Sequence, residues 1–286
     1  MTVRTKLSIR PLTPTIGAEI GGVDLREPLD DATISAIRRA LLDHLVIFFR
    51  DQDITPAQQL RFSEYFGPVM VSIIDTKQTE VPGVTVLDQA APKGEYTDRW
   101  HTDHTFVAEP PLGSVLRAVQ LPSSGGDTCF ASMYAAYDAL SSSMQRFLDG
   151  LTAVHSTEIV TRGTQHLTNV VYRDADSPLP AVVHPVIRVH PETGRKLLFV
   201  CGNFTTRIVE LTEAESASVL ALLLEHIKDP RFQCRFRWEV ASVAFWDNRA
   251  AQHCAIPDYT ERRLMYRTMI GGGDRPVGPA TREGES

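Results

Sequence analysis

The sequence predicts one domain of the mostly β class with helices (α+β), in which short strands form the core and a few helices lie on its flanks. Short apolar runs bounded by Gly, Pro or Asp recur along the 286 residues, which is typical of strands and turns. Apolar residues at helical spacing occur in only a few segments. Since there is neither an internal repeat nor an interdomain linker, we expect a single domain over residues 1–286, ordered from about 8 to 275 and frayed at its C-terminal tail.

Helices are expected over residues 31–44, 55–67, 132–140, 141–148 and 212–228. In the first of these, Ile34, Ile37 and Leu41 recur at helical spacing, and Asp30 or Asp31 can cap the start of the helix. The second begins with Thr55-Pro56, and the last begins with the capping box Thr212-Glu-Ala-Glu215. Cap residues therefore predict where these helices begin.

Strands are expected over residues 45–49, 84–87, 114–119, 232–238, 243–246 and 264–270, with a hairpin at 182–200. Two segments, 91–98 and 156–181, are polar and weakly patterned. We expect each of them to be a loop, either a lid over a site or disordered.

Composition restricts the classes of partner. The formal net charge of -6 disfavours a nucleic-acid-binding surface, which needs a basic patch. The four cysteines are scattered, as in a reduced intracellular protein. No apolar segment follows the N-terminal charges, and the longest apolar run, Val219–Leu224, is too short to cross a bilayer. We therefore expect a cytoplasmic protein that acts on a small molecule, with neither nucleic acid nor membrane as a partner.

The stretch Arg99–Phe106 presents the first chemical signal. His101 and Asp103 are two residues apart, so both side chains point to the same face of an extended segment. Together they supply two of the three ligands of a facial iron site. A second triplet, His190-Pro-Glu192, shows how easily this spacing arises, and its proline at an expected turn breaks the extended presentation. We expect only the first triplet to bind a metal.

Such a site needs one more histidine. The candidates elsewhere in the chain are His44, His104, His155, His166, His184, His226 and His253. His104 lies on the opposite face from Asp103 and is not expected to share the metal. His253 follows the strand and turn Phe-Trp-Asp-Asn-Arg and precedes Arg263 and Arg267, so it is the strongest candidate. Two histidines and an aspartate would also suit a zinc hydrolase or a metal-binding protein without catalysis.

A resemblance narrows these alternatives. The chain carries, in order, Trp-His-Thr-Asp with Phe106, Gly-Gly-Asp-Thr at 125–128, Phe-Thr-Thr-Arg-Ile-Val at 204–209, Trp-Asp-Asn-Arg with the later His253, and Arg-Arg-Leu-Met-Tyr-Arg at 262–267. With these five motifs the chain resembles the taurine dioxygenase/TfdA family of Fe(II)- and 2-oxoglutarate-dependent dioxygenases. The resemblance implies a double-stranded β-helix (jelly-roll) core with flanking helices.

The resemblance also implies roles for particular residues. His101, Asp103 and His253 would hold Fe(II), and Arg263 and Thr128 would bind the distal carboxylate of 2-oxoglutarate. The remaining iron positions would take the other end of 2-oxoglutarate and O2. A planar guanidinium suits a carboxylate because it binds bidentately and stays charged. Asn248 and Arg249 are expected to have supporting structural roles.

The substrate is expected to be small and anionic. In taurine-specific members of the family, a histidine that reaches the sulfonate follows the Phe-Gly after the second helix. That position falls here on Ser72, and an aromatic position three residues later falls on Asp75, whose charge would repel a sulfonate. The resemblance places Arg267 at the anionic group of the substrate, with Ser72, Phe106 and Phe204 beside it. We expect a sulfonate, alkyl sulfate ester or carboxylate, with taurine as the alternative, and a homodimer or homotetramer in a pathway of sulfur metabolism.

Overall fold

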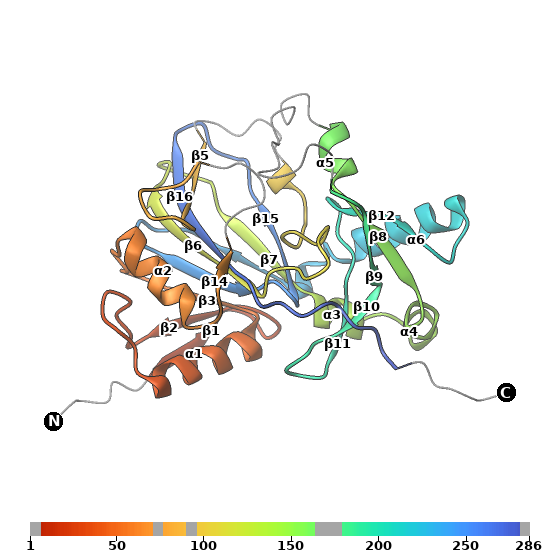
Figure 1. Ribbon diagram of the computed structural model, residues 1–286, viewed down its shortest axis with the longest axis horizontal. Coiled ribbons are helices and arrows are strands. Elements are labelled where there is room, and N and C mark those ends of the chain that lie inside the picture. Colours follow the sequence, from red (N-terminus) through yellow and green to blue (C-terminus); the bar gives the residue numbers. More distant parts are fainter. Residues whose placement is uncertain (1–6, 71–76, 90–95, 164–178, 281–286) are drawn as a thin grey trace.

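The structure is a computed structural model that describes residues 7–70, 77–89, 96–163 and 179–280 (Figure 1). The main sheet orders its strands β1-β2-β3-β14-β6-β16-β4, and β5 also pairs with β16. These strands are β1 (Ser8–Pro11), β2 (Ala18–Gly21), β3 (Val46–Phe49), β4 (Val69–Met70), β5 (Thr85–Gln89), β6 (Gly113–Gln120), β14 (Val243–Asp247) and β16 (Arg263–Ile270). Every pairing in this sheet is antiparallel except that of β2 with β3.

Three smaller antiparallel sheets complete the described β structure. The first orders its strands β13 (Gln233–Phe236), β7 (Thr128–Ser132) and β15 (Ala251–Ala255). The second orders β12 (Thr205–Ile208), β8 (Thr152–His155) and β9 (Val182–Pro185), and the third pairs β10 (Ile187–Val189) with β11 (Lys196–Leu198).

The helices lie on the flanks of these sheets (Figure 1). They are α1 (Asp31–His44), α2 (Pro56–Glu64), α3 (Met133–Asp138), α4 (Ser142–Leu148), α5 (Glu158–Gly163) and α6 (Glu213–His226), with short 3-10 turns η1 (Tyr96–Asp98) and η2 (Pro230–Phe232). The predicted caps are confirmed: Asp30 caps α1, and capping boxes open α2 at Thr55 and α6 at Thr212.

The core between the main sheet and the β13-β7-β15 sheet is aromatic. Phe48 of β3 stacks on Phe236 of β13 at 3.8 Å between ring centroids, and it meets Phe130 of β7 edge-on at 5.7 Å. The next residue, Phe49, points to the opposite face of the main sheet, where its ring packs against Phe62 of α2. Both faces of β3 are therefore buried, which explains why its sequence is a continuous apolar run.

Two expectations from the sequence differ from the structure. Residues 182–200 do not form one hairpin, because β9 pairs with β8 and only β10 pairs with β11. The segment expected as a loop at 156–181 begins with α5, and residues 164–178 lie outside the described part of the chain. In the other expected loop, 91–98, residues 91–95 also lie outside it and residues 96–98 form η1.

The C-terminal segment crosses the small β10-β11 sheet. The backbone N–H of Val189 donates to the carbonyl of Val277 at 2.8 Å, so the chain is bridged to β10 beyond residue 275. Within the described ranges, no helix is long and apolar enough to cross a membrane.

Candidate metal centre

His101 and His253 face each other across an isolated antiparallel bridge. The N–H of His101 donates to the carbonyl of His253 at 3.0 Å, and the N–H of His253 donates back at 2.9 Å. His253 belongs to β15, while His101 follows η1. This reciprocal pair brings the two imidazole centroids to 4.2 Å, although 151 intervening residues separate them in the sequence.

Asp103 completes a three-residue cluster. Its Oδ1 lies 3.8 Å from Nε2 of His101 and 3.8 Å from Nε2 of His253. One ligand atom from each of these residues lies within 4.8 Å of the other two, and all three residues are buried. Among the described residues no other group of His, Cys, Asp or Glu meets these criteria for a metal site.

The protonation of this cluster favours a divalent cation. Burial lowers the pKa of His101, and it lowers that of His253 to about 3, so both imidazoles are neutral. Burial would raise the pKa of Asp103, but positive charge around it brings the pKa well below the usual value, and the Arg267 guanidinium supplies this charge even while both imidazoles are neutral. The carboxylate is therefore ionised. Two neutral imidazoles and one carboxylate are a donor set that suits Fe(II).

Hydrogen bonds orient these ligands. Nδ1 of His101 lies 2.7 Å from the carbonyl of Arg99, which assigns the proton to Nδ1 and leaves the Nε2 lone pair facing Asp103. The hydroxyl of Ser114 on β6 donates to Oδ2 of Asp103 at 3.0 Å. One carboxylate oxygen is therefore held by serine, and the other faces the two histidines.

A cavity of about 220 Å³ opens beside the cluster. Its lining combines β5, β6, β7, β14, β15 and β16, and comprises Val86, Leu87, Asp88, Gln89, Thr97, His101, Leu116, Thr128, Trp246, His253, Ala255, Arg263 and Arg267. The two arginines lie four residues apart on β16, so both project from the same face of the strand. The cavity wall therefore presents two positively charged guanidinium groups next to the cluster.

Arg263 is buried without a carboxylate partner among the residues the structure describes. Its Nε donates to the carbonyl of Gly126 at 3.1 Å, and burial lowers its pKa. Thr128 lies on the same cavity wall, where its hydroxyl oxygen accepts a hydrogen bond from Nε1 of Trp238 at 3.0 Å. The Thr128 proton is then available to a group in the cavity, as are the remaining N–H groups of Arg263.

Arg267 lies closer to the cluster. Its Nη1 is 3.5 Å from Oδ1 of Asp103, and its Nε has no hydrogen-bond partner within the described segments. A buried guanidinium with an unsatisfied N–H is costly unless an anion or water binds it. This position suits an anionic group of a ligand next to the metal.

Comparison with known proteins agrees with this geometry. Residues 8–269 match the sequence model of the taurine catabolism dioxygenase TauD, TfdA family. The chain belongs to this family. It is 38% identical, over 96% of its length and 92% of the relative, to a protein of Pseudomonas putida named alpha-ketoglutarate-dependent sulfate ester dioxygenase. It is 35% identical, over 96% of its length and 87% of the relative, to an alkylsulfatase of Acinetobacter baylyi.

A solved structure supports the same conclusion. The crystal structure of a taurine dioxygenase from Burkholderia xenovorans has a TM-score of 0.81 and 39% identity, and the match covers 96% of this chain and 94% of that one. The predicted jelly-roll core with flanking helices is thus confirmed. The chain is a member of a family of Fe(II)- and 2-oxoglutarate-dependent dioxygenases, as its motifs predicted.

Not every residue singled out in the TauD/TfdA motifs lines the cavity. Phe106 and Phe204 pack against each other at 4.9 Å between centroids, in a small apolar cluster with Cys201, and neither belongs to the lining above. Ser72 lies outside the described residues. His104 has a positive φ of 50°, and burial lowers its pKa to about 4, while its ring packs against Phe106 instead of joining the cluster.

Sequence reasoning missed several contributors to this TauD/TfdA site. Leu87, Leu116 and Trp246 form apolar parts of the cavity wall, and Ser114 holds Asp103. Alternation offered a signal, since Ser114 and Leu116 are two residues apart on the expected strand. No sequence signal, however, indicated that this strand lies beside Asp103.

Proposed function

We propose that this chain hydroxylates a small anionic organic substrate, with sulfate esters and sulfonates foremost, in a reaction that consumes 2-oxoglutarate and O2. In this proposal His101, Asp103 and His253 hold Fe(II). Arg263 and Thr128 bind the distal carboxylate of 2-oxoglutarate, and Arg267 binds the anionic group of the substrate. The names of the relatives from P. putida and A. baylyi support sulfate esters as the first class to test.

One observation carries the proposal. Arg263 is buried in the cavity beside the cluster and has no carboxylate partner in the described part of the chain. A buried cation needs an anion, and a dicarboxylate anchored at the metal would supply one. A zinc hydrolase has no comparable use for this residue, so Arg263 favours the dioxygenase over the alternative.

The residues of the chain bind and orient the reactants. When bound, iron with 2-oxoglutarate and O2 supplies the oxidising chemistry that hydroxylates a C–H bond as 2-oxoglutarate becomes succinate and CO2. Arg263 and Thr128 fix 2-oxoglutarate at the end remote from the metal. Arg267 fixes the anionic group, so a carbon next to that group is held near the cluster. Leu87, Leu116 and Trp246 keep water from that side of the cavity.

The product depends on the group that Arg267 binds. If the hydroxylated carbon carries a sulfate ester, its C–O bond breaks, the electron pair leaves with sulfate, and loss of the hydroxyl proton gives an aldehyde. A sulfonate gives sulfite in the same way, through its C–S bond. A carboxylate substrate without a leaving group on that carbon would remain hydroxylated. An aryloxy acid would instead give a hemiacetal, whose ether C–O bond breaks to release a phenol and leave a 2-oxo acid. Phe106 and Phe204 remain predicted contacts of the carbon chain, together with Ser72.

Succinate release tests the proposal. Purified protein with Fe(II), 2-oxoglutarate and ascorbate is incubated with alkyl sulfates, alkyl sulfonates including taurine, and aryloxy acids. We expect succinate to form in step with aldehyde and sulfate when an alkyl sulfate is the substrate. Arg267→Ala should weaken the binding of the alkyl sulfate more than the binding of 2-oxoglutarate. Hydrolysis of a sulfate ester in the absence of 2-oxoglutarate would contradict the proposal and favour the hydrolase.

We also propose that the chain works in the cytoplasm as a homodimer or homotetramer. Its four cysteines, Cys129, Cys201, Cys234 and Cys254, are free thiols, which suits a reducing compartment. Light scattering coupled to gel filtration measures the assembly, and a monomeric mass would contradict this part of the proposal.

A further inference from the structure

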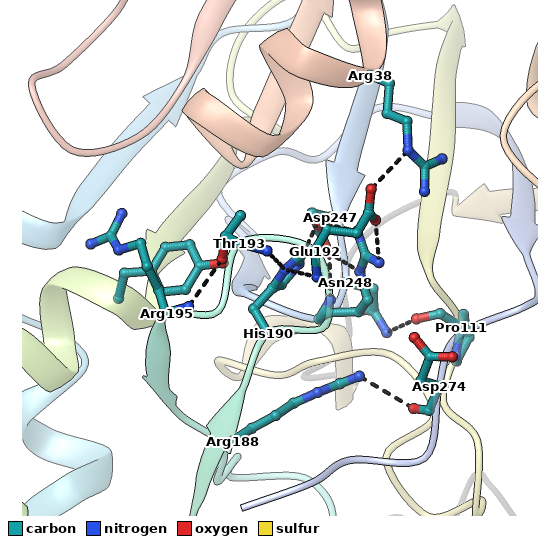
Figure 2. A network of polar contacts seen from close by, with 12 residues as sticks. Arg38, Pro111, Arg188, His190, Glu192, Thr193, Arg195, Asp247, Asn248 and Asp274 are labelled. Atoms are coloured by element: carbon teal, nitrogen blue, oxygen red, sulfur yellow. Dashed lines mark hydrogen bonds and ion pairs between the residues drawn. The ribbon is translucent and has the colours of Figure 1, made fainter. Parts of the chain in front are cut away.

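The backbone of Asp103 is clamped by one side chain. The N–H of Asp103 donates to Oδ1 of Asn248 at 2.9 Å, and Nδ2 of Asn248 donates to the carbonyl of Asp103 at 2.9 Å. Nδ2 also donates to the carbonyl of Pro111 at 3.2 Å (Figure 2), and Asn248 is buried. A carboxamide is both donor and acceptor in one plane, so it can satisfy both backbone groups of this residue at once.

Asn248 is itself fixed by its neighbours in the turn after β14. Its N–H donates to the carbonyl of Leu112 at 3.0 Å. On one side of it, Asp247 accepts two hydrogen bonds from the guanidinium of Arg249, at 2.9 and 2.7 Å, and one from its backbone N–H at 2.9 Å. Asp247 is fully buried, and Arg249 holds its pKa far below the usual range against the opposing effect of burial. The turn that presents Asn248 is therefore closed by a bidentate ion pair.

The second triplet supports this turn. Nδ1 of His190 accepts from the N–H groups of Glu192 and Thr193, both at 3.2 Å, so the proton lies on Nε2. Nε2 then donates to Oδ2 of Asp247 at 3.1 Å (Figure 2). His190 is buried and has both ring nitrogens bonded, so it is oriented as firmly as the carboxylate it holds.

Alternating charges extend the network to the surface. Oε1 of Glu192 accepts from Nη1 of Arg249 at 2.7 Å, and Oε2 accepts from Nε of Arg38 on α1 at 2.9 Å. The side chain of Arg38 is 39% exposed, whereas Arg249 and Asp247 are buried. Buried ion pairs add little net stability on average, but they fix geometry where partners are fully bonded.

We infer that Asn248 is a positioning residue for the metal ligand Asp103, and that His190, Asp247, Arg249 and Glu192 hold Asn248 in place for this role. The inference rests on the proposed function, because it takes Asp103 as an iron ligand. Ser114 holds the Oδ2 end of the same residue, while Asn248 holds its backbone. Loss of either lets the carboxylate oxygen move away from the point where both histidines face it.

The test measures metal binding directly. Wild type and Asn248→Ala are titrated with Co(II) alone, whose visible absorption reports coordination geometry. Removing a residue that hydrogen-bonds a metal-ligating residue typically weakens metal binding by roughly 10- to 100-fold. We expect Asn248→Ala to weaken Co(II) binding by this amount and to shift the absorption spectrum. Asn248→Ser, which keeps one hydrogen-bonding group, should fall between the two. If Asn248→Ala does not fold, Asn248→Ser replaces it in the titration.

Gln52 offers a matched control. It is also a buried amide that bridges backbone segments, through bonds to Leu25, Val23 and Arg50, but far from the cluster in the sequence and absent from the cavity lining. Gln52→Ala should lower the melting temperature and leave Co(II) affinity unchanged. If folded Asn248→Ala binds Co(II) with the affinity and spectrum of wild type, the inference is wrong but the proposed metal site stands. If Asn248→Ala does not fold, the same result for Asn248→Ser has the same meaning. Failure of wild type to bind Co(II) would overturn the metal site and the inference together.

Discussion

The two His-x-carboxylate triplets of this chain have the same spacing, but their side chains have different surroundings. His101 and Asp103 direct Nε2 and Oδ1 toward each other and toward His253, with a cavity beside them. Nε2 of His190 donates a hydrogen bond to Asp247, and Glu192 accepts from Arg249 and Arg38. In the first triplet the donor atoms of His101, Asp103 and His253 face one another across the cluster. In the second, hydrogen bonds to other side chains already satisfy them.

The difference shows that spacing alone does not make a metal site. What distinguishes the first triplet is a third ligand, brought opposite by the reciprocal hydrogen bonds of His101 and His253. The second triplet is unsuited to a metal because it lies at a turn, where Arg249 and Arg38 already bind the carboxylate of Glu192. It still serves the first triplet, since it supports the turn that carries Asn248.

Removing the carboxylate from the first triplet should have the largest effect. Asp103→Ala takes away a ligand and leaves Arg267 without its nearby anion. We expect substrate-dependent succinate release to fall by more than the roughly 100-fold that the loss of an outer contact can cost. Turnover assays with saturating Fe(II) measure this, and activity within a few-fold of wild type would contradict the ligand assignment.

Arg263→Ala should come next, with an effect confined to 2-oxoglutarate. Loss of one partner from a buried charge pair costs about 2–5 kcal/mol, so 2-oxoglutarate should bind at least roughly 30-fold more weakly. Co(II) affinity should stay the same, because Arg263 touches none of the three ligands. Calorimetric titration with each ligand separates the two, and a parallel loss of metal affinity would show that Arg263 has been given the wrong role.

A histidine outside both triplets should show how a buried imidazole makes stability depend on pH. Burial lowers the pKa of His155 to about 3 from its ordinary 6.5. As pH falls below 6.5 the unfolded chain takes up a proton that the folded chain refuses, so this stability is present above pH 6.5 and lost below it. At pH 5 the loss should be about 2 kcal/mol. Urea unfolding of wild type and His155→Gln should therefore show a steeper decline for wild type. Parallel pH profiles would exclude His155 as the cause.

Glu192→Gln should have the smallest effect. It removes the charge that lies between Arg249 and Arg38 but keeps a hydrogen-bonding group of the same shape. Because Glu192 is partly exposed, we expect the free energy of unfolding to fall by only about 1 kcal/mol. Its Co(II) affinity should fall less than that of Asn248→Ala. A larger metal effect for Glu192→Gln would place the control of Asp103 in the second triplet instead of in Asn248.

The sequence predicted the parts of this molecule that depend on neighbours along the chain. Cap residues Asp30, Thr55 and Thr212 open their helices as expected, and apolar runs such as Val46–Phe49 became buried strands. Several short strands were missed: β4, β7, β8, β12 and β15, the last of which carries His253. Their pairing is set by distant partners that no local pattern shows.

The site divides in the same way. The motifs brought together His101, Asp103, His253, Arg263, Arg267 and Thr128, and the structure places all six around one centre. The hydrogen bonds of Asn248 to Asp103 could not be predicted in detail, because the two residues are 145 positions apart. The partner groups on Asp103 are its backbone N–H and carbonyl, which every residue type has except proline, so no sequence pattern marks them. The ring contact between Phe106 and Phe204 likewise joins residues that lie far apart in the sequence.

Anaerobic titration of the wild-type protein with Fe(II) and 2-oxoglutarate tests the central claim most directly. When both are bound at one metal, a metal-to-ligand charge-transfer band appears in the visible spectrum. We predict this band for wild type, its absence in Asp103→Ala, and its appearance in Arg263→Ala only at higher 2-oxoglutarate concentration. Fe(II) binding without any band at saturating 2-oxoglutarate would contradict the account, because the cluster would then be a metal site that does not bind this co-substrate.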